Sequence, residues 1–311
     1  MNDLILHPTG ETEPTALVPF AGPVAVDTFG GRVHVEWDPQ AAVTPLGQLP
    51  FFTEFLHVSG RFDPWVDSCP LRLTSPNAPR KRDVLGTVML SILAGHQRYA
   101  HISALRGDTI NPPLLGMSAV VSEDSVRGNL GKMDETAGVE WLQDHLSYCV
   151  APLLNEPWIL DVDVTVKPLY GHQEGAVKGY NPHKPGRPSH TYHTYFLSSL
   201  RLILDVEVKA GNQTASKYSS PGLWELLGRL PRAHWPALIR GDRDWGTQAN
   251  MARAEQEGVP YLFKLRMTKG VKKTVERLMR GATWSEADQG WQGAETRLRL
   301  EGWSQARRTI V

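Results

Sequence analysis

Apolar residues recur at helical spacing in the first half of the chain. Residues 46–58 (LGQLPFFTEFLHV) and the longer segment 83–106 place apolar side chains three or four positions apart, which is typical of amphipathic helices. Ser122 and the two acidic residues after it predict a helix over residues 122–130, and another is expected over residues 141–154. We therefore predict a mainly helical domain over residues 31–156.

After Pro157 the pattern changes to short β-rich runs separated by turns. The predicted order is three strands, a helix, a strand, a helix and a strand, at residues 158–166, 191–200, 202–209, 220–230 (entered through Pro221), 237–241, 248–257 (ended by Gly258) and 260–267. This is the order of an RNase H-like core, in which the first and fourth strands lie side by side. The predicted fold class is thus α/β, with an RNase H-like mixed sheet over residues 157–280.

Two aspartates follow aliphatic runs in this β-rich half. Asp163 lies in WILDVDVTV and Asp242 in ALIRGDRDWG, so adjacent first and fourth strands would bring their carboxylates together. Hard divalent cations take oxygen ligands, and two-metal phosphoryl-transfer sites use such carboxylates. Asp161, two residues back on the same strand face, and Asp244 are the alternative ligands. The other acids considered, which we expect to be exposed strand or loop residues, are Asp205, Glu207 and Asp288.

Composition limits the classes of protein that fit. The 311 residues are 41% hydrophobic and 21% charged, with a formal net charge of zero, so any attraction to nucleic acid must be local. Residues 1–30 are rich in Pro, Thr and Gly and predict a loosely ordered leader with a short strand at 24–29. Neither a signal peptide nor a membrane-length apolar run is present, so we expect a cytoplasmic protein without membrane contact.

Basic residues gather in two segments of this neutral chain. Four lie between residues 164 and 193, against the single acid Glu174, and further lysines lie between 264 and 280, against Glu276; the predicted DNA contacts are Lys167, Lys178, Lys184, Arg187, Lys269, Lys272 and Lys273. Such clusters fit phosphate contacts. A solvated helix face explains the second cluster equally well. Residues 122–130 are similar to the second helix of a helix-turn-helix, although an ordinary bundle helix also fits.

Other chemistries have weaker support. Four histidines, at positions 172, 183, 190 and 193, suggest zinc, but no cysteine or nearby carboxylate completes a tetrahedral set, and Cys69 and Cys149 have no CxxC spacing. Tryptophans are more often packing residues than base-stacking platforms; Trp245, three residues after Asp242, is the one that merits a test. No GxSxG, GxGxxG or GxxxxGK[ST] motif occurs.

Two long stretches resemble the DDE-type transposases of bacterial insertion sequences. They are LDVDVTVKPLYGHQEGAVKGYNPHKPGRPSHTYH and IRGDRDWGTQANMARAEQEGVPYLFKLRMTKG, with weaker similarity in ILAGHQRYAHISALRGD and SEDSVRGNL. The resemblance implies Mg²⁺-dependent DNA cleavage and strand transfer, with Mn²⁺ as a substitute. It also implies that double-stranded DNA (the element's terminal inverted repeats and the target) is the partner, bound by a homodimer. Asp163 falls in the family's Asp-x-Thr step and Asp242 in its Gly-Asp step.

A third carboxylate is expected in this family, in a Tyr-x-x-Arg-x-x-Glu arrangement on a late helix. No such spacing occurs in the last fifty residues, and Glu286, Glu295 and Glu301 lie in predicted turns or strands. Residues 281–311 are similar to the start of the family's β-rich insertion, and the apolar strand at the end would lack a partner. We therefore expect a truncated, catalytically incomplete transposase. The alternative is a non-catalytic DNA-binding remnant.

Overall fold

The computed structural model describes residues 24–28, 30–36 and 38–311. The chain divides into two compact units, Met1–Met133 and Asp134–Val311. Most of the predicted leader lies outside the described residues. Its expected strand is β1 (Val24–Thr28), which pairs with β2 (Gly31–Val35) in an antiparallel hairpin.

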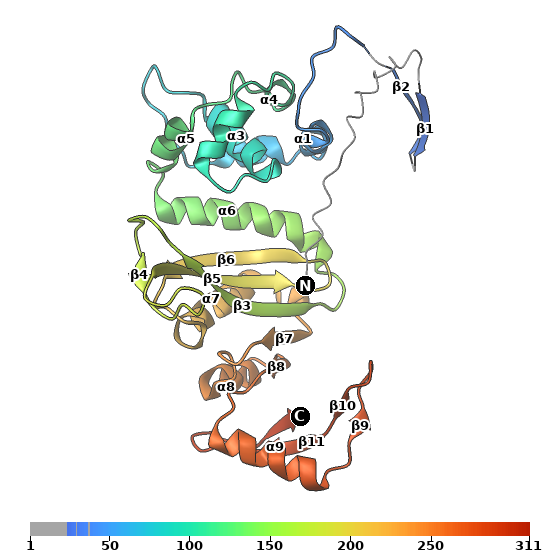
Figure 1. Cartoon of the computed structure of the whole chain (residues 1–311), viewed down its shortest axis with the longest axis vertical. Helices are drawn as coiled ribbons and strands as arrows, with labels where there is room; N and C mark the ends of the chain where they lie inside the picture. The colour runs from blue at the N-terminus through green and yellow to red at the C-terminus, as the bar shows by residue number, and fades with distance from the viewer. Residues whose placement is uncertain (1–23, 29, 37) are drawn as a thin grey trace, which may run out of the picture. The chain divides into compact units, whose positions relative to one another are not determined.

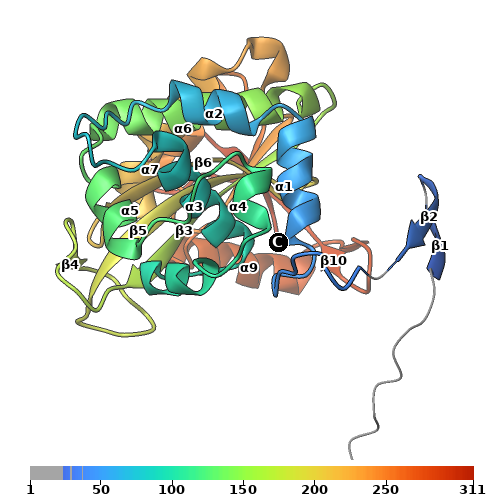
Figure 2. The same cartoon turned by 90° about the horizontal axis from the view of Figure 1, so that it is seen from above.

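The first unit is helical, as predicted. Its elements are α1 (Leu49–Val58), α2 (Phe62–Ser68), α3 (Lys81–Leu93), the 3₁₀ helix η1 (Tyr99–Leu105), α4 (Asn111–Leu114) and α5 (Glu123–Leu130), and Figure 2 shows α1, α3, α4 and α5 grouped together. The Ser122 hydroxyl accepts the Ser125 N–H, which confirms the predicted cap of α5. The segment 83–106, predicted to be helical, is divided into α3 and η1, because the chain leaves α3 through Gly95, whose φ is +74°.

Basic residues at the start of α3 make contacts within the protein. Arg80 pairs with Asp83 at 2.8 Å, and Arg82 pairs with Asp63 at 2.7 Å. Lys81 Nζ donates to two backbone carbonyls at the end of α2, those of residues 67 and 69. These three side chains therefore stabilise the packing of the unit.

The second unit begins with α6 (Glu135–Val150), followed by the short 3₁₀ helix η2 (Ala151–Leu153). Asp134 caps α6 by accepting the Ala137 N–H. The helix lies along the sheet strand β6 (Leu202–Ala210), and Gln143 Nε2 donates to Asp205 of that strand at 3.0 Å (Figure 1). Because of these contacts, the boundary between units lies at residues 133/134 and α6 groups with the sheet.

A mixed sheet forms the centre of the second unit. Besides β6, its strands in the described chain are β3 (Ile159–Pro168), β4 (Val177–Lys178), β5 (Pro188–Leu197), β7 (Leu238–Gly241) and β8 (Tyr261–Phe263). They lie in the order β4-β5-β3-β7-β8, with β6 also paired to β5. Strand β3 is antiparallel to β5 and parallel to β7, and β7 is parallel to β8. The predicted α/β class and RNase H-like strand order are confirmed.

One face of the sheet packs on helix α7 (Ala215–Arg229). Leu160 and Val162 of β3 join Ile239 of β7 and Leu223 and Leu227 of α7 in the main hydrophobic core. The expectation that this helix is entered through Pro221 is wrong, since Thr214 is the N-cap and Pro221 lies inside the helix. The helix begins earlier because hydrogen bonds to β5 hold its first turns.

The end of the chain packs on helix α8 (Gln248–Gln256). After β8 come α9 (Lys269–Gly281), the pair β9 (Ser285–Glu286) and β10 (Gln292–Gly293), then β11 (Glu295–Leu298) and β12 (Arg307–Ile310); the short 3₁₀ helix η3 (Arg232–His234) precedes β7. The expected unpaired terminal strand is wrong, because β12 pairs with β11. A small core of Met251, Val271, Leu298 and Trp303 holds these elements together. No helix in the described chain is long and apolar enough to span a membrane.

Candidate functional site

Sheet register brings the two predicted metal-binding aspartates together. In the parallel pairing of β3 with β7, Val162 lies opposite Gly241, so the next residues, Asp163 and Asp242, take neighbouring positions. Leu160 and Val162 point into the core, and strand alternation therefore places the Asp163 side chain on the opposite face. Strand β3 continues past Asp163 to Pro168, paired with β5. Asp163 thus lies where the β7 pairing ends rather than at a strand end.

Asp161 and Asp163 have different surroundings although they share a strand face. The Arg240 guanidinium donates to both Asp161 oxygens at 2.6 Å and also to the Ser198 hydroxyl at 2.9 Å. This pairing holds the pKa of Asp161 below its usual range. The Asp163 carboxylate is exposed and has no hydrogen-bond or ion-pair partner among the described residues. Asp163 is therefore the carboxylate of this pair that is open to a ligand.

A tight turn after β7 presents Asp242. Its Oδ1 accepts the backbone N–H of Asp244 at 2.9 Å, and its side chain is exposed. Asp244, the alternative ligand in this turn, pairs through its carboxylate with Arg266 at 2.7 Å. Thr247 caps α8 by accepting the Asn250 N–H. Asp242 is thus the carboxylate of this turn that has no ion-pair partner among the described residues.

Other acids in the sheet are committed to structural contacts. Asp205, expected to be exposed, is buried and pairs with Arg229 at 2.6 Å. Glu207 pairs with Lys209 at 2.8 Å and accepts from the Tyr195 hydroxyl at 2.6 Å. Asp288 is exposed in a turn, as expected. Across the part of the chain that is described, no three His, Cys, Asp or Glu side chains cluster closely enough to hold a metal ion.

A pocket of about 290 Å³ opens beside Asp242. Strands β3 and β5 contribute Val164, Thr165, Val166 and Thr191, the turn after β7 contributes Asp242, Arg243 and Asp244, and the remaining lining residues are Tyr180, Pro182, His183, Gly211 and Thr214. Tyr180 and Arg243 were not identified from the sequence as site residues, and His183 was considered only as a zinc ligand. The available signal was their place in the segments GYNPHKPG and GDRDWG, next to residues that were identified.

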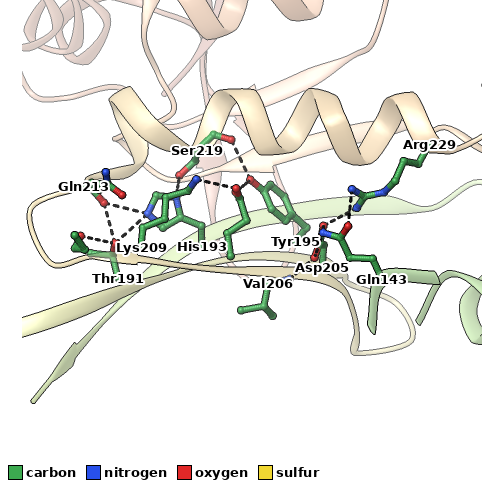
Figure 3. Close-up of polar contacts among 12 residues, drawn as sticks. Gln143, Thr191, His193, Tyr195, Asp205, Val206, Lys209, Gln213, Ser219 and Arg229 are labelled. Carbon is green, nitrogen blue, oxygen red and sulfur yellow. Dashed lines mark hydrogen bonds and ion pairs between the residues drawn. The ribbon is translucent and has the colours of Figure 1, made fainter. Parts of the chain in front are cut away.

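Behind the pocket, a buried polar network joins β5 to the first turns of α7 (Figure 3). His193 Nε2 donates to the Gln213 carbonyl at 3.0 Å, and Nδ1 accepts from the Ser219 hydroxyl. Thr191 Oγ1 lies 2.9 Å from the same Gln213 oxygen, to which it donates. Burial lowers the pKa of His193 and so keeps the ring neutral. Because both ring nitrogens are used, His193 is a structural residue and the zinc hypothesis has no support.

Two aromatic side chains of the second unit differ in exposure, and only Trp245 was considered from the sequence. Trp245 is 1% exposed and packs against Phe263, with ring centroids 6.2 Å apart, so it cannot serve as an open stacking surface. Tyr170 is exposed, but its ring is covered by Lys184 and by Arg187, whose Cζ lies 4.5 Å from the centroid. These cations lower the pKa of Tyr170, with the Lys184 hydrogen bond as the main cause.

Every residue predicted to contact DNA is exposed. Lys167 lies on β3, Lys178 on β4, and Lys184 and Arg187 in the connection to β5. On α9, Val271, Thr274 and Leu278 are buried and the lysines occupy the other side, at positions 269, 272 and 273. The helix is amphipathic, so its cations are free to meet a polyanion, and their role remains a prediction.

Comparison with solved structures gives distant likenesses. A cryo-EM structure of the piggyBac transposase synaptic complex with hairpin DNA is 12% identical, with a TM-score of 0.32, covering 88% of this chain and 54% of that chain. A crystal structure of the Mos1 mariner paired-end complex with Mn is 12% identical, with a TM-score of 0.24, covering 76% of this chain and 91% of that chain. This chain thus spans about half the length of the piggyBac chain. Scores this low carry no weight for function.

Sequence comparison is more direct. No curated protein sequence matches the chain. The family model described as Transposase DDE domain group 1 matches residues 78–311, which includes both aspartate motifs and the whole mixed sheet. Because this match extends over most of the chain, the protein belongs to the DDE transposase family.

Proposed function

We propose that this chain is the transposase of a bacterial insertion sequence, and that Asp163 and Asp242 bind the metal for DNA cleavage and strand transfer. The observation that carries the proposal is the β3–β7 register, which makes two exposed carboxylates neighbours, and one of them, Asp242, lines a pocket. Neither carboxylate forms a salt bridge with any of the described residues. The substrate would be double-stranded DNA at the element's terminal inverted repeats and at the target, bound by a homodimer.

The side chains present fit a hard divalent cation. Asp163 and Asp242 supply oxygen ligands, which Mg²⁺ prefers and Mn²⁺ also accepts, and water would complete the coordination. When bound, such an ion would lower the pKa of an attacking water or 3′-hydroxyl and stabilise the leaving oxygen. The protein itself would orient the phosphate and exclude competing ligands. Arg240 donates to both Asp161 oxygens and so keeps Asp161 from competing for the cation. The cation would then be bound by the two open carboxylates, Asp163 and Asp242.

DNA would be positioned by exposed basic residues in the two segments that follow the Asp163 and Asp242 motifs. The basic residues of the β3–β5 connection and of α9 are exposed and would contact phosphate oxygens, which hold a duplex without reading its sequence. We propose that the helical region within residues 31–156 adds further DNA contacts. Since the chain's formal net charge is zero, binding would depend on these local clusters.

Two carboxylates are fewer than the three that the DDE mechanism uses. Among the described residues, no group of three His, Cys, Asp or Glu side chains is placed to hold a metal ion, and the neighbouring acids Asp161 and Asp244 are paired with arginines. We therefore propose that this chain binds metal weakly and cleaves DNA little by itself. The second candidate function, favoured by the same observation, is DNA binding without catalysis.

Metal-dependent thermal stability tests the aspartate pair. Mg²⁺ or Mn²⁺ at tenfold excess over its Kd should stabilise the wild type by about 1.4 kcal/mol. Asp163→Ala should abolish this increase, whereas Asp144→Ala, which removes an exposed acid from α6, should retain it. Equal metal stabilisation of Asp163→Ala and the wild type would refute the assignment. Strong Mg²⁺-dependent nicking that Asp163→Ala abolishes would instead show that two acids suffice.

A further inference from the structure

The pocket beside Asp242 carries side chains that neither the metal site nor the protein core uses. We propose that Tyr180, His183 and Arg243 form a subsite that positions the nucleotide next to the phosphate held at Asp163 and Asp242. This inference rests on the proposed function and adds to it three residues that contact the substrate. It is argued from the elements that build the pocket and from the lining side chains that make no contact with other described residues.

Two close backbone contacts fix the wall that carries Tyr180 and His183. A Cβ on Gly179 would lie 1.9 Å from the Gly211 carbonyl oxygen, and a Cβ on Gly211 would lie 2.3 Å from that of Ser189. The loop after β4 therefore packs directly on the chain that leads into α7. Asn181, buried between the two exposed residues, accepts the Lys184 N–H at 3.0 Å and closes the turn. The wall is thus a packed element of the fold.

On this wall, Tyr180 keeps an open ring. Its side chain is 61% exposed, and no hydrogen bond, ring contact or cation–π contact to it occurs within the described chain. Tyr170, at the other end of the same connection, has its ring covered by two cations. An exposed aromatic ring that lines a pocket is the surface on which a nucleobase stacks. Tyr180 therefore fits the base of a bound nucleotide.

The turn after β7, which also lines the pocket, supplies charge of the right sign. Arg243 is exposed and its guanidinium has no ion-pair partner among the residues described, whereas its neighbour Asp244 is neutralised by Arg266. Arg243 can therefore contact a phosphate oxygen through its planar donors. His183, also exposed, lines the same pocket as Tyr180 and has ring nitrogens that can hydrogen-bond to a nucleotide. A base stacked on Tyr180 and a phosphate bound by Arg243 would together make up a nucleotide.

The hydroxyl of Thr165, an exposed residue of β3, suits the sugar between these groups. The pocket is also lined by Thr191 of β5, which is buried, and by Thr214, the N-cap of α7. The buried His193 network holds the last two in place by binding the Gln213 carbonyl. The pocket volume of about 290 Å³ lies at the small end of the range for ligand sites, so one nucleotide rather than a duplex would enter.

Binding of a short fluorescent single-stranded oligonucleotide tests the subsite. Tyr180→Ala should weaken binding by about tenfold or more, because loss of one base–aromatic stack has that effect. Tyr180→Phe should bind like the wild type. Arg243→Gln should lower the slope of log K against log salt by about 0.7, the value for one phosphate contact on a single strand. Trp291→Ala, which removes another exposed aromatic side chain, is the matched control and should bind normally.

Placing 2-aminopurine at each position of the oligonucleotide in turn identifies the base that stacks on Tyr180. Its fluorescence should be quenched at one position in the wild type and in Tyr180→Phe, and should recover in Tyr180→Ala. If the wild type binds the strand and Tyr180→Ala binds it equally well, the subsite is refuted while the proposed function stands. If the wild type binds neither single-stranded nor duplex DNA, the proposed function fails and the subsite with it.

Discussion

Glu255→Gln should destabilise the second unit by breaking its link to the end of the chain. Glu255 on α8 accepts from the Arg307 guanidinium at 2.6 and 2.9 Å, and it also accepts from the hydroxyl of Tyr261 at 2.7 Å. Arg307 is nearly fully buried and also lies over the Trp303 ring, with Cζ 5.2 Å from the centroid. The pair therefore holds β12 against α8, and removing one partner leaves a buried charge without compensation.

The pKa of Glu255 gives the size of the effect. The Arg307 hydrogen bond is the main cause that lowers this pKa from 4.5 to about 2. Burial, followed by the hydrogen bond to Glu255, raises the pKa of Tyr261 to about 12. A shift of that size corresponds to about 3 kcal/mol, which is an upper bound because the Glu255 side chain is 28% exposed. Loss of about 2 kcal/mol would lower the Tm by roughly 4–8 °C.

Urea denaturation followed by circular dichroism measures this change. Because the folded pKa lies below the unfolded one, the stabilisation is complete above pH of about 4.5 and is lost as the pH falls toward 2. Glu255→Gln should therefore be less stable at pH 7, and its stability should fall less between pH 4.5 and 2 than that of the wild type. Glu301→Gln, at an exposed turn position, is the control. Equal stability of Glu255→Gln and wild type at pH 7 would refute the reasoning.

Three further predictions concern the site. Gly179→Ala should cost about 1–3 kcal/mol in urea denaturation because its Cβ would meet the Gly211 carbonyl, whereas Gly128→Ala, with open space around it, should not destabilise; equal effects would contradict the packed wall. Arg240→Gln should raise the pKa of Asp161 in a carboxyl ¹³C titration, and an unchanged pKa would contradict the ion pair. Replacing three α9 lysines by Gln should lower the salt slope of duplex binding by about 2.7, and an unaltered slope would exclude contacts by Lys269, Lys272 and Lys273.

Much of the fold was predictable because local patterns specify it. Alternation of Leu160, Asp161, Val162 and Asp163 determines which side chains enter the core, and the order of strands and helices restricts the sheet to few topologies. Caps such as Ser122 define helix starts through contacts three residues away. Where local signals were weak, prediction failed: the backbone turns at Gly95, and the helix that contains Pro221 begins six residues before it.

The sequence alone thus determined the fold class, the family resemblance and the pair of aspartate motifs, because these depend on periodicity and on residues close together in the chain. Tertiary structure decided which side chains remain open. Asp161 and Asp163 look alike in sequence, and only Arg240, 79 positions from Asp161, distinguishes them by neutralising one. Likewise, packing buries Trp245 and leaves Tyr180 exposed beside Asp242. Burial and ion pairing are set by contacts between distant segments, which no local pattern records.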